Sequence, residues 1–205
     1  MQPWSSRRLL VAAALWAGVT LIGALWLDVP IARAAARIDD AVIDAVRTGL
    51  RGLEIVLLLD LSKFAIGIGL VVLGLMAWRW RPGLARVFLY VGATHALTRL
   101  IAGLLKNVFG RHRPHEVPFD PTFFHDGGIS FPSGHTAHVF ALLFPLLVLR
   151  PRAGWIFAPV ALYVLVARVL PGDHFLSDTT ASAALAALFA ALLRPIAPRT
   201  SPGAP

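Results

Sequence analysis

Long apolar runs alternate with short polar segments along most of this 205-residue chain. Runs of about 17 to 25 residues are long enough for a helix to cross the hydrocarbon core of a bilayer. The spans predicted on this basis are Leu9–Leu27, Ile55–Trp78, Leu84–Leu105, Ser133–Leu149, the run from Arg152 to about Leu170, and Leu176–Leu193. No repeat or second domain interrupts them. We therefore predict an all-α, six-transmembrane helix bundle, a single domain over residues 1–205 with a disordered tail at 194–205.

The first apolar run follows a short basic head, Met1–Arg8, and this order is shared by secretory signal peptides. The small residues Ala34, Ala35 and Ala36 would then imitate a cleavage site. The run is longer than a typical signal core, and further spans follow it. An uncleaved first span is therefore predicted.

Between the first two spans, the segment Ile31–Leu53 shows a helical alternation of charged and apolar positions. Its charged face comprises Arg33, Arg37, Asp40, Asp44, Arg47 and Arg51. This spacing predicts an amphipathic helix that lies in the membrane surface. The mixed signs favour an ordinary solvated face, and a role in admitting substrate is the alternative.

Several ionisable residues, among them Asp60, Lys63, His95 and Arg99, fall inside predicted spans, where charge is costly unless paired. Asp60 and Arg99 are each about 10 Å below the same membrane surface at 1.5 Å per residue, so we predict that they pair. His95, one turn from Arg99, is interpreted as a packing residue.

Composition supports the membrane assignment and removes other classes. The chain is 57% hydrophobic and 15% charged, whereas soluble proteins are usually about 25% charged. Its 19 Lys and Arg against 11 Asp and Glu give a net charge of +8. These cations stand singly at span ends, which favours membrane lipids as partners and argues against nucleic acid. The absence of Cys excludes disulfides and thiolate metal sites. Nothing in the sequence predicts an oligomeric state.

Charge asymmetry predicts the orientation of the spans. Six spans place both termini on one side, and the arginines expected there are Arg7, Arg8, Arg79, Arg81, Arg86, Arg150, Arg152, Arg194 and Arg199. No acidic residue accompanies them. The positive-inside rule therefore favours cytoplasmic termini and, in a bacterium, an inner-membrane protein whose other face is periplasmic or extracellular.

The candidate chemistry lies at three span ends on that other face. Phe131 to His138 reads Phe-Pro-Ser-Gly-His-Thr-Ala-His, and Ser133 is placed to cap a helix whose first N–H groups, at Gly134 and His135, suit an anion. Upstream cations are Lys106 and Arg113; a downstream cluster comprises Arg168, His174 and Asp178. Because each cluster ends an apolar run, we predict that all three meet around one phosphate.

The residue types and their spacing indicate chemical roles within the three clusters. His174 and Asp178 are four apart at a helix start, so they share a face and the carboxylate can fix the tautomer of the imidazole. Cations and helix N–H donors stabilise the charge that develops during phosphoryl transfer. His135 is the better candidate for the general acid, an assignment that rests on the placing of Asp178 beside His174 and on the family resemblance given next. His138, one turn further, either supports it or only lines the helix.

These motifs resemble those of the type 2 phosphatidic acid phosphatase superfamily, membrane lipid phosphatases related to vanadium haloperoxidases. The motif resemblance covers about Lys106 to Asp178. It implies a phosphohistidine formed on His174, no cofactor, and a lipid phosphate substrate such as undecaprenyl diphosphate, phosphatidylglycerol phosphate, phosphatidic acid or lipid A phosphate. Ala167 departs from the pattern, since the family often has Ser before the Arg of the third motif.

Three alternatives stay open at this point. The same intermediate would serve a phosphotransferase that passes the phosphoryl group to an acceptor. A lipid-binding or transport protein could keep only the anion pocket, although binding alone would not need the His174–Asp178 pair. A metal site is disfavoured because the sequence lacks paired carboxylates and HExxH spacing.

The polar loop after Lys106, with Glu116, Asp120 and several aromatic residues, is either a lid or an ordinary interfacial loop.

Overall fold

The computed structural model describes residues 2–58, 64–117 and 119–198, and over these residues the protein is all-helical, with no strand. The prediction of an all-α fold is confirmed. The helices are α1 (Ser6–Ile22), α2 (Asp28–Ala35), α3 (Asp40–Val56), α4 (Ala65–Ala77), α5 (Pro82–Phe109), α6 (Gly134–Leu149), α7 (Pro151–Val169) and α8 (Leu176–Leu192). A π-helical segment, η1 (Gly23–Leu27), joins α1 to α2, and a 3-10 turn, η2 (Arg194–Ile196), follows α8.

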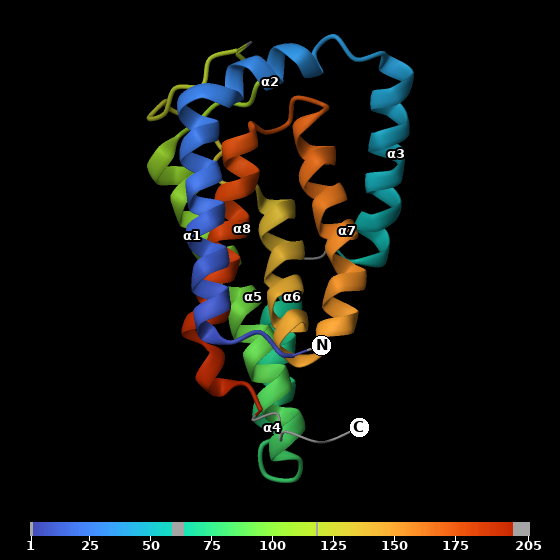
Figure 1. Ribbon diagram of the computed structural model, residues 1–205, viewed down its shortest axis with the longest axis vertical. Coiled ribbons are helices and arrows are strands. Elements are labelled where there is room, and N and C mark those ends of the chain that lie inside the picture. Colours follow the sequence, from blue (N-terminus) through green and yellow to red (C-terminus); the bar gives the residue numbers. More distant parts are fainter. Residues whose placement is uncertain (1, 59–63, 118, 199–205) are drawn as a thin grey trace.

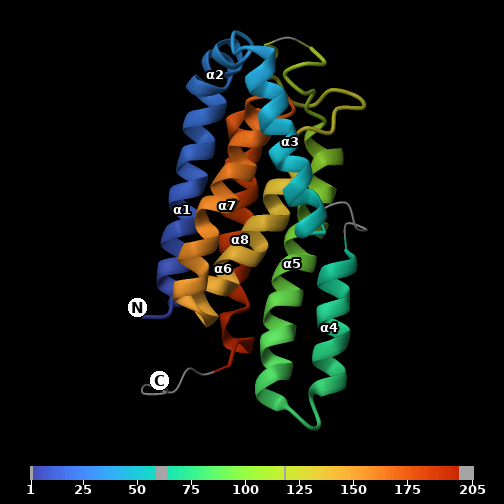
Figure 2. The ribbon, with the colours of Figure 1, turned by 90° about the vertical axis from the view of Figure 1, so that its right-hand side faces the viewer.

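The helices form an elongated bundle whose two ends differ (Figure 1). α1 packs along α8, α4 pairs with α5, and α6 lies against α5, α7 and α8. The inward face of α8 carries the fully buried residues Ala183, Ala186, Ala187 and Ala190. Because these side chains are small, neighbouring helices approach α8 closely. The α4–α5 turn and the start of α1 lie at one end, and α2 and the α7–α8 turn lie at the other (Figures 1 and 2).

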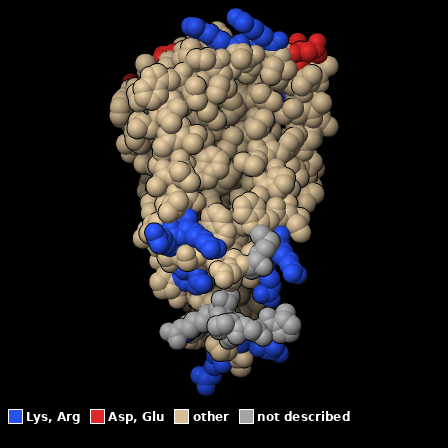
Figure 3. Space-filling model, in the orientation of Figure 1, with Lys and Arg blue, Asp and Glu red and all other residues tan. Residues whose placement is uncertain are grey.

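The distribution of charge is that of an integral membrane protein. Three helical segments are long and apolar enough to cross a bilayer, namely Ser6–Ala35, Pro82–Phe109 and Pro151–Val169. Helices α4, α6 and α8 are apolar but shorter. On the face shown in Figure 3, Lys and Arg side chains lie at the two ends of the molecule, and an uncharged band separates them.

The predicted amphipathic helix Ile31–Leu53 is wrong in its bounds. Ile31 belongs to α2, which ends at Ala35, and a new helix, α3, begins at Asp40. The side chain of Asp39 accepts a hydrogen bond from the Ala41 N–H at 2.8 Å and caps α3. α2 lies across the end of the bundle, whereas α3 descends beside α7 (Figures 1 and 2). The Tyr163 hydroxyl of α7 donates to the Val46 carbonyl at 3.0 Å and fixes this position of α3.

The predicted start of the second span at Ile55 is also wrong. Residues Ile55 and Val56 continue α3, which ends where Leu58 adopts a positive φ of 54°. No Gly or Pro separates the amphipathic segment from the apolar run that follows, so the sequence offers no breaker at the true boundary. Asp60, the predicted partner of Arg99, lies outside the described residues.

Candidate active site

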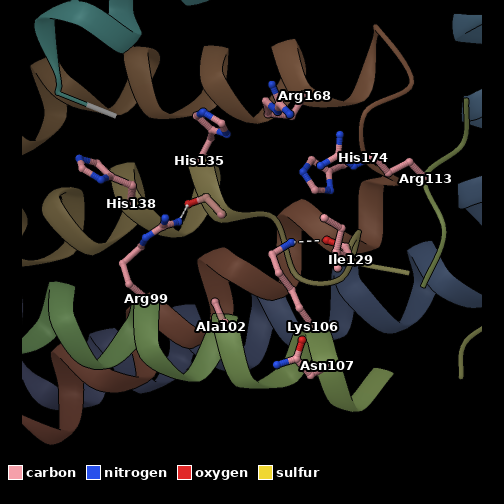
Figure 4. Close-up of a pocket in the computed structure, with 12 residues that line it drawn as sticks. Arg99, Ala102, Lys106, Asn107, Arg113, Ile129, His135, His138, Arg168 and His174 are labelled. Atoms are coloured by element: carbon pink, nitrogen blue, oxygen red, sulfur yellow. Dashed lines mark hydrogen bonds between the residues drawn. The ribbon is translucent and has the colours of Figure 1, made fainter. Parts of the chain in front are cut away.

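A cavity of about 350 Å³ opens where the C-terminal parts of α5 and α7 and the start of α6 meet the segments that follow α5 and α7. Figure 4 shows the side chains that line it. They are Arg99, Ala102, Gly103, Lys106, Asn107, Arg113, Ile129, Gly134, His135, His138, Arg168 and His174. The three predicted clusters therefore contribute to one cavity, which is called the phosphate pocket below.

The end of α5 positions the first pair of cations. Gly110 ends the helix in the left-handed region at φ 45°, and a Cβ there would lie 2.1 Å from the His125 carbonyl oxygen. Glycine is therefore required for this turn. Lys106, in the last turn, donates to the carbonyl oxygens of Ile129 and Ser130, the latter at 3.3 Å. Arg113 follows the turn and also lines the phosphate pocket.

The start of α6 brings Gly134 and His135 to the phosphate pocket, whereas Ser133 lies behind it. Ser133 occupies the N-cap position, but its hydroxyl accepts a hydrogen bond from the Thr136 hydroxyl at 3.2 Å and caps no backbone N–H. The Ser133 N–H donates to the Asp178 carbonyl at 2.9 Å. In this arrangement Ser133 joins α6 to α8 and does not line the phosphate pocket.

His174 and Asp178 form the predicted pair at the start of α8. His174 Nδ1 lies 3.5 Å from Asp178 Oδ2 and 3.2 Å from the Ser130 hydroxyl, which donates to the same carboxylate at 2.5 Å. The Phe175 N–H also donates to this carboxylate, at 2.9 Å. Burial lowers the pKa of His174 to about 4, although the hydrogen bond with Asp178 opposes this shift. The imidazole is therefore neutral at pH 7.

Two of the three guanidinium groups that line the phosphate pocket, those of Arg113 and Arg168, lie beside acidic side chains. Arg168 Nη1 lies 3.1 Å from Asp173 Oδ2, and the Arg168 side chain is 12% exposed. Arg113 Nε lies 3.9 Å from Glu116 Oε1, and the Arg113 N–H donates to the other Glu116 oxygen at 2.9 Å. These acids hold the cations in place without entering the lining of the phosphate pocket.

Behind Asp178 lies a buried ion network that sequence reasoning missed. The guanidinium of Arg111, which is 0% exposed, donates to Asp178 at 2.6 Å, to Ser177 at 2.7 Å and to Asp28 at 2.7 Å. Asp28 also accepts from the Ser177 N–H at 2.9 Å, at the start of α8. The rings of Phe123 and Phe175 stack on the guanidinium, at 4.4 and 4.1 Å. This network anchors the carboxylate that holds His174.

Two further residues belong to the site although they were not among the site residues predicted from the sequence. Glu54, near the end of α3, lies with Oε1 at 3.3 Å from His135 Nε2. Arg99, on α5, donates to the Gly134 carbonyl and lines the phosphate pocket. His138 lies beside it, and its Nδ1 is 3.1 Å from His95 Nε2. His95, which was predicted to be a packing residue, is buried and contacts His138 of the phosphate pocket.

The predicted site residues separate into two groups. Those that line the phosphate pocket are Lys106, Arg113, Gly134, His135, Arg168 and His174, whereas Ser133 and Asp178 support it from behind. Ala167, the departure from the family pattern, is fully buried in α7. Among the residues that the structure describes, no three His, Asp or Glu side chains converge as metal ligands would.

The fold and the site together define an integral-membrane helical protein with a cationic pocket beside a buried histidine–carboxylate pair. The family model described as PAP2 superfamily matches residues 86–201, more than half of the chain. The chain therefore belongs to the PAP2 superfamily.

Two curated relatives carry the name lipid A 1-phosphatase. The protein from Rhizobium johnstonii (strain DSM 114642 / LMG 32736 / 3841) is 36% identical over 109 residues, which are 50% of this chain and 45% of the relative. The protein from Rhizobium etli (strain ATCC 51251 / DSM 11541 / JCM 21823 / NBRC 15573 / CFN 42) is 35% identical over 109 residues, 50% of this chain and 47% of the relative. The match thus spans about half the length of these relatives.

The fold is also that of a solved structure, the crystal structure of the first transmembrane PAP2 type phosphatidylglycerolphosphate phosphatase from Bacillus subtilis. The TM-score is 0.60 at 22% sequence identity, and the superposition covers 90% of this chain and 94% of that one. At this identity the likeness concerns the fold.

Proposed function

We propose that this chain is a metal-independent lipid phosphate or diphosphate phosphatase that acts through a phosphohistidine on His174. The observation that carries the proposal is the phosphate pocket itself, which brings three histidines, one of them the neutral His174, and four cations to one cavity. The motif residues, the membership of the PAP2 superfamily and the names of the relatives support the same chemistry.

His174 is the proposed nucleophile because its Nδ1 faces Asp178 and Ser130, which leaves Nε2 free. The Nε2 lone pair attacks phosphorus, the bond from phosphorus to the leaving oxygen breaks, and its electrons remain on that oxygen. Water then attacks phosphorus and passes a proton to His135, and the bond from phosphorus to Nε2 breaks with its electrons returning to nitrogen, so that inorganic phosphate is released. Lys106, Arg113 and Arg168 offset the charge on the phosphoryl oxygens in both steps.

His135 is the proposed general acid, and it protonates the leaving oxygen in the first step. Glu54 extends this assignment, because a carboxylate 3.3 Å from Nε2 can orient the ring toward the leaving oxygen. We infer that His135–Glu54 serves proton transfer while His174–Asp178 serves nucleophilic attack. The two histidine–carboxylate pairs thus divide the reaction.

We further propose that α1 and α4 to α8 are the six spans, with cytoplasmic termini and the phosphate pocket on the periplasmic or extracellular side of a bacterial inner membrane. All described acids lie in α2, α3, α8 or the loops near the phosphate pocket, whereas the opposite end carries only basic charges. This asymmetry follows the positive-inside rule. α2, which lies across the pocket end of the bundle in Figure 1, takes the interfacial position.

Phosphate release by the purified protein from a panel of lipids tests the proposal. The panel comprises undecaprenyl diphosphate, phosphatidylglycerol phosphate, phosphatidic acid and a lipid A phosphate, each with EDTA and with or without an acceptor lipid. We expect release in EDTA that His174→Ala abolishes. Transfer to the acceptor without release would establish a phosphotransferase, and binding without turnover would establish a lipid-binding protein.

A further inference from the structure

The phosphate pocket contains more positive charge than one phosphoryl group requires. Four of its lining residues are Lys or Arg, and none of its described lining residues is Asp or Glu. Three of these cations, Lys106, Arg113 and Arg168, belong to the motifs that hold the transferred phosphoryl group. The fourth, Arg99, has no role in that mechanism.

Arg99 lies at the inner end of the phosphate pocket. It precedes Lys106 by seven residues on α5, so the two share a helix face and Arg99 is about 10 Å deeper along the helix. Figure 4 shows Lys106, Arg113 and His174 toward one end of the close-up, Arg99 and His138 toward the other, and His135 between them. A Cβ added at Gly134 would lie 2.8 Å from Arg99 Nη1, so the guanidinium reaches the start of α6.

The direction of nucleophilic attack gives the two ends of the phosphate pocket different roles. In phosphoryl transfer the nucleophile and the leaving oxygen lie roughly in line on opposite sides of phosphorus. When His174 attacks from one end, the leaving group points past His135 toward Arg99 and His138. Among the described residues, Glu54 contacts His135 from α3 and partly offsets the local positive charge.

We propose that Arg99, with His138 beside it, forms an anion subsite for a second phosphate carried by the leaving group. This inference rests on the proposed function and narrows its substrates to one class, namely lipids whose leaving group is itself anionic. The second phosphate has two possible sources with the same chemistry: the inner phosphate of a lipid diphosphate, or the phosphodiester of a phosphatidylglycerol phosphate headgroup. Arg99 stabilises either by a charge-assisted hydrogen bond.

Matched substrate pairs test the subsite. The kcat/KM for phosphate release is measured in detergent micelles for an isoprenyl diphosphate and the corresponding monophosphate, and for phosphatidylglycerol phosphate and phosphatidic acid. Arg99→Gln keeps a donor for the Gly134 carbonyl and loses the charge. For Arg99→Gln we expect kcat/KM to fall about 10- to 100-fold on at least one substrate with an anionic leaving group and less than threefold on the matched substrate without one. A loss of this size corresponds to one charged hydrogen bond.

Three controls make the outcome decisive. Arg99→Lys keeps the charge and should preserve the substrate preference within about fivefold. Arg86→Gln removes an exposed charge from the same helix and should change neither member of a pair. Thermal unfolding of each variant checks folding. A loss on the diphosphate alone identifies that source, and a loss on phosphatidylglycerol phosphate alone identifies the other.

Equal losses on both members of each pair would overturn the subsite and leave Arg99 as a support for Gly134. If the wild-type protein releases no phosphate from any substrate, the proposed function fails, and binding still tests the subsite. In that case titration calorimetry compares inorganic pyrophosphate with orthophosphate. The subsite predicts that Arg99→Gln weakens pyrophosphate about tenfold or more and orthophosphate less than threefold, and equal weakening would refute it.

Discussion

Replacing Arg111 by Met should destabilise the protein strongly, because among the described residues Arg111 is the only Lys or Arg that pairs with the two buried carboxylates of Asp28 and Asp178. Asp28 and Asp178 are 2% and 0% exposed, and Arg111 bonds both at 2.6 to 2.7 Å. Breaking a buried ion pair by removal of one partner costs about 3–5 kcal/mol of unfolding free energy. Loss of the stacking on Phe123 and Phe175 adds to this cost.

In a chain of this length each kcal/mol corresponds to about 2–4 °C of melting temperature, so we expect Arg111→Met to melt about 6–20 °C lower. The fluorescence of the six Trp residues follows unfolding of the detergent-solubilised protein. Activity should also fall at temperatures where the variant is folded, because Asp178 then loses the group that fixes it. Inhibition of the wild type by orthophosphate checks that the detergent preserves the site.

Arg113→Met is the matched control, two residues further along the same loop. The side chain of Arg113 is 28% exposed and faces the phosphate pocket, so its loss should reduce kcat/KM about 10-fold or more with little change in melting temperature. The two variants should therefore separate stability from substrate binding. A melting temperature of Arg111→Met within 2 °C of wild type, or equal destabilisation by Arg113→Met, would refute the reasoning.

Three further predictions concern proton transfer, the nucleophile and orientation. Glu54→Gln should slow hydrolysis of a phosphate monoester about 10-fold and hydrolysis of a diphosphate about threefold or less, because the leaving group of a diphosphate needs less protonation. Equal losses of rate on the two substrates in steady-state assays would contradict the role of Glu54. Only neutral His174 attacks, and its pKa is lowered to about 4, so kcat/KM corrected for substrate ionisation should not fall between pH 7 and about 5 and should decline below pH 5. A decline on acidification with a midpoint near pH 6.5 would contradict this. In the Cys-free chain, an impermeant maleimide on intact cells should label Gly127→Cys and spare Ala153→Cys, and the reverse pattern would invert the proposed orientation.

The residues that line the phosphate pocket could largely be predicted from sequence, because cations, a Gly at a helix start and a His four residues before an Asp each have a local meaning. What the sequence could not show is which of them touch the substrate space. In the sequence, Ser133 and Gly134 are equally plausible contacts for a phosphate at the start of α6. The Ser133 N–H instead bonds the Asp178 carbonyl of α8, and the Ser133 side chain is buried away from the phosphate pocket.

The supporting residues were missed because their roles depend on tertiary contacts. Arg111 is one loop cation among several in the sequence, and only the turn at Gly110 directs it into the protein. Asp28 lies at an apparent span end, and the π-helical segment η1 that turns it toward Ser177 has no sequence signal. Glu54 reaches His135 because α3 descends along the bundle, which its amphipathic pattern does not predict.

Trapping of the covalent intermediate tests the central claim most directly. The protein is mixed briefly with a lipid substrate labelled with ³²P in the terminal phosphate, quenched in alkaline detergent and separated by electrophoresis. We predict an alkali-stable, acid-labile label on the wild-type protein and on His135→Ala, and none on His174→Ala. Rapid phosphate release without any labelled protein, or a label that persists in His174→Ala, would contradict the mechanism.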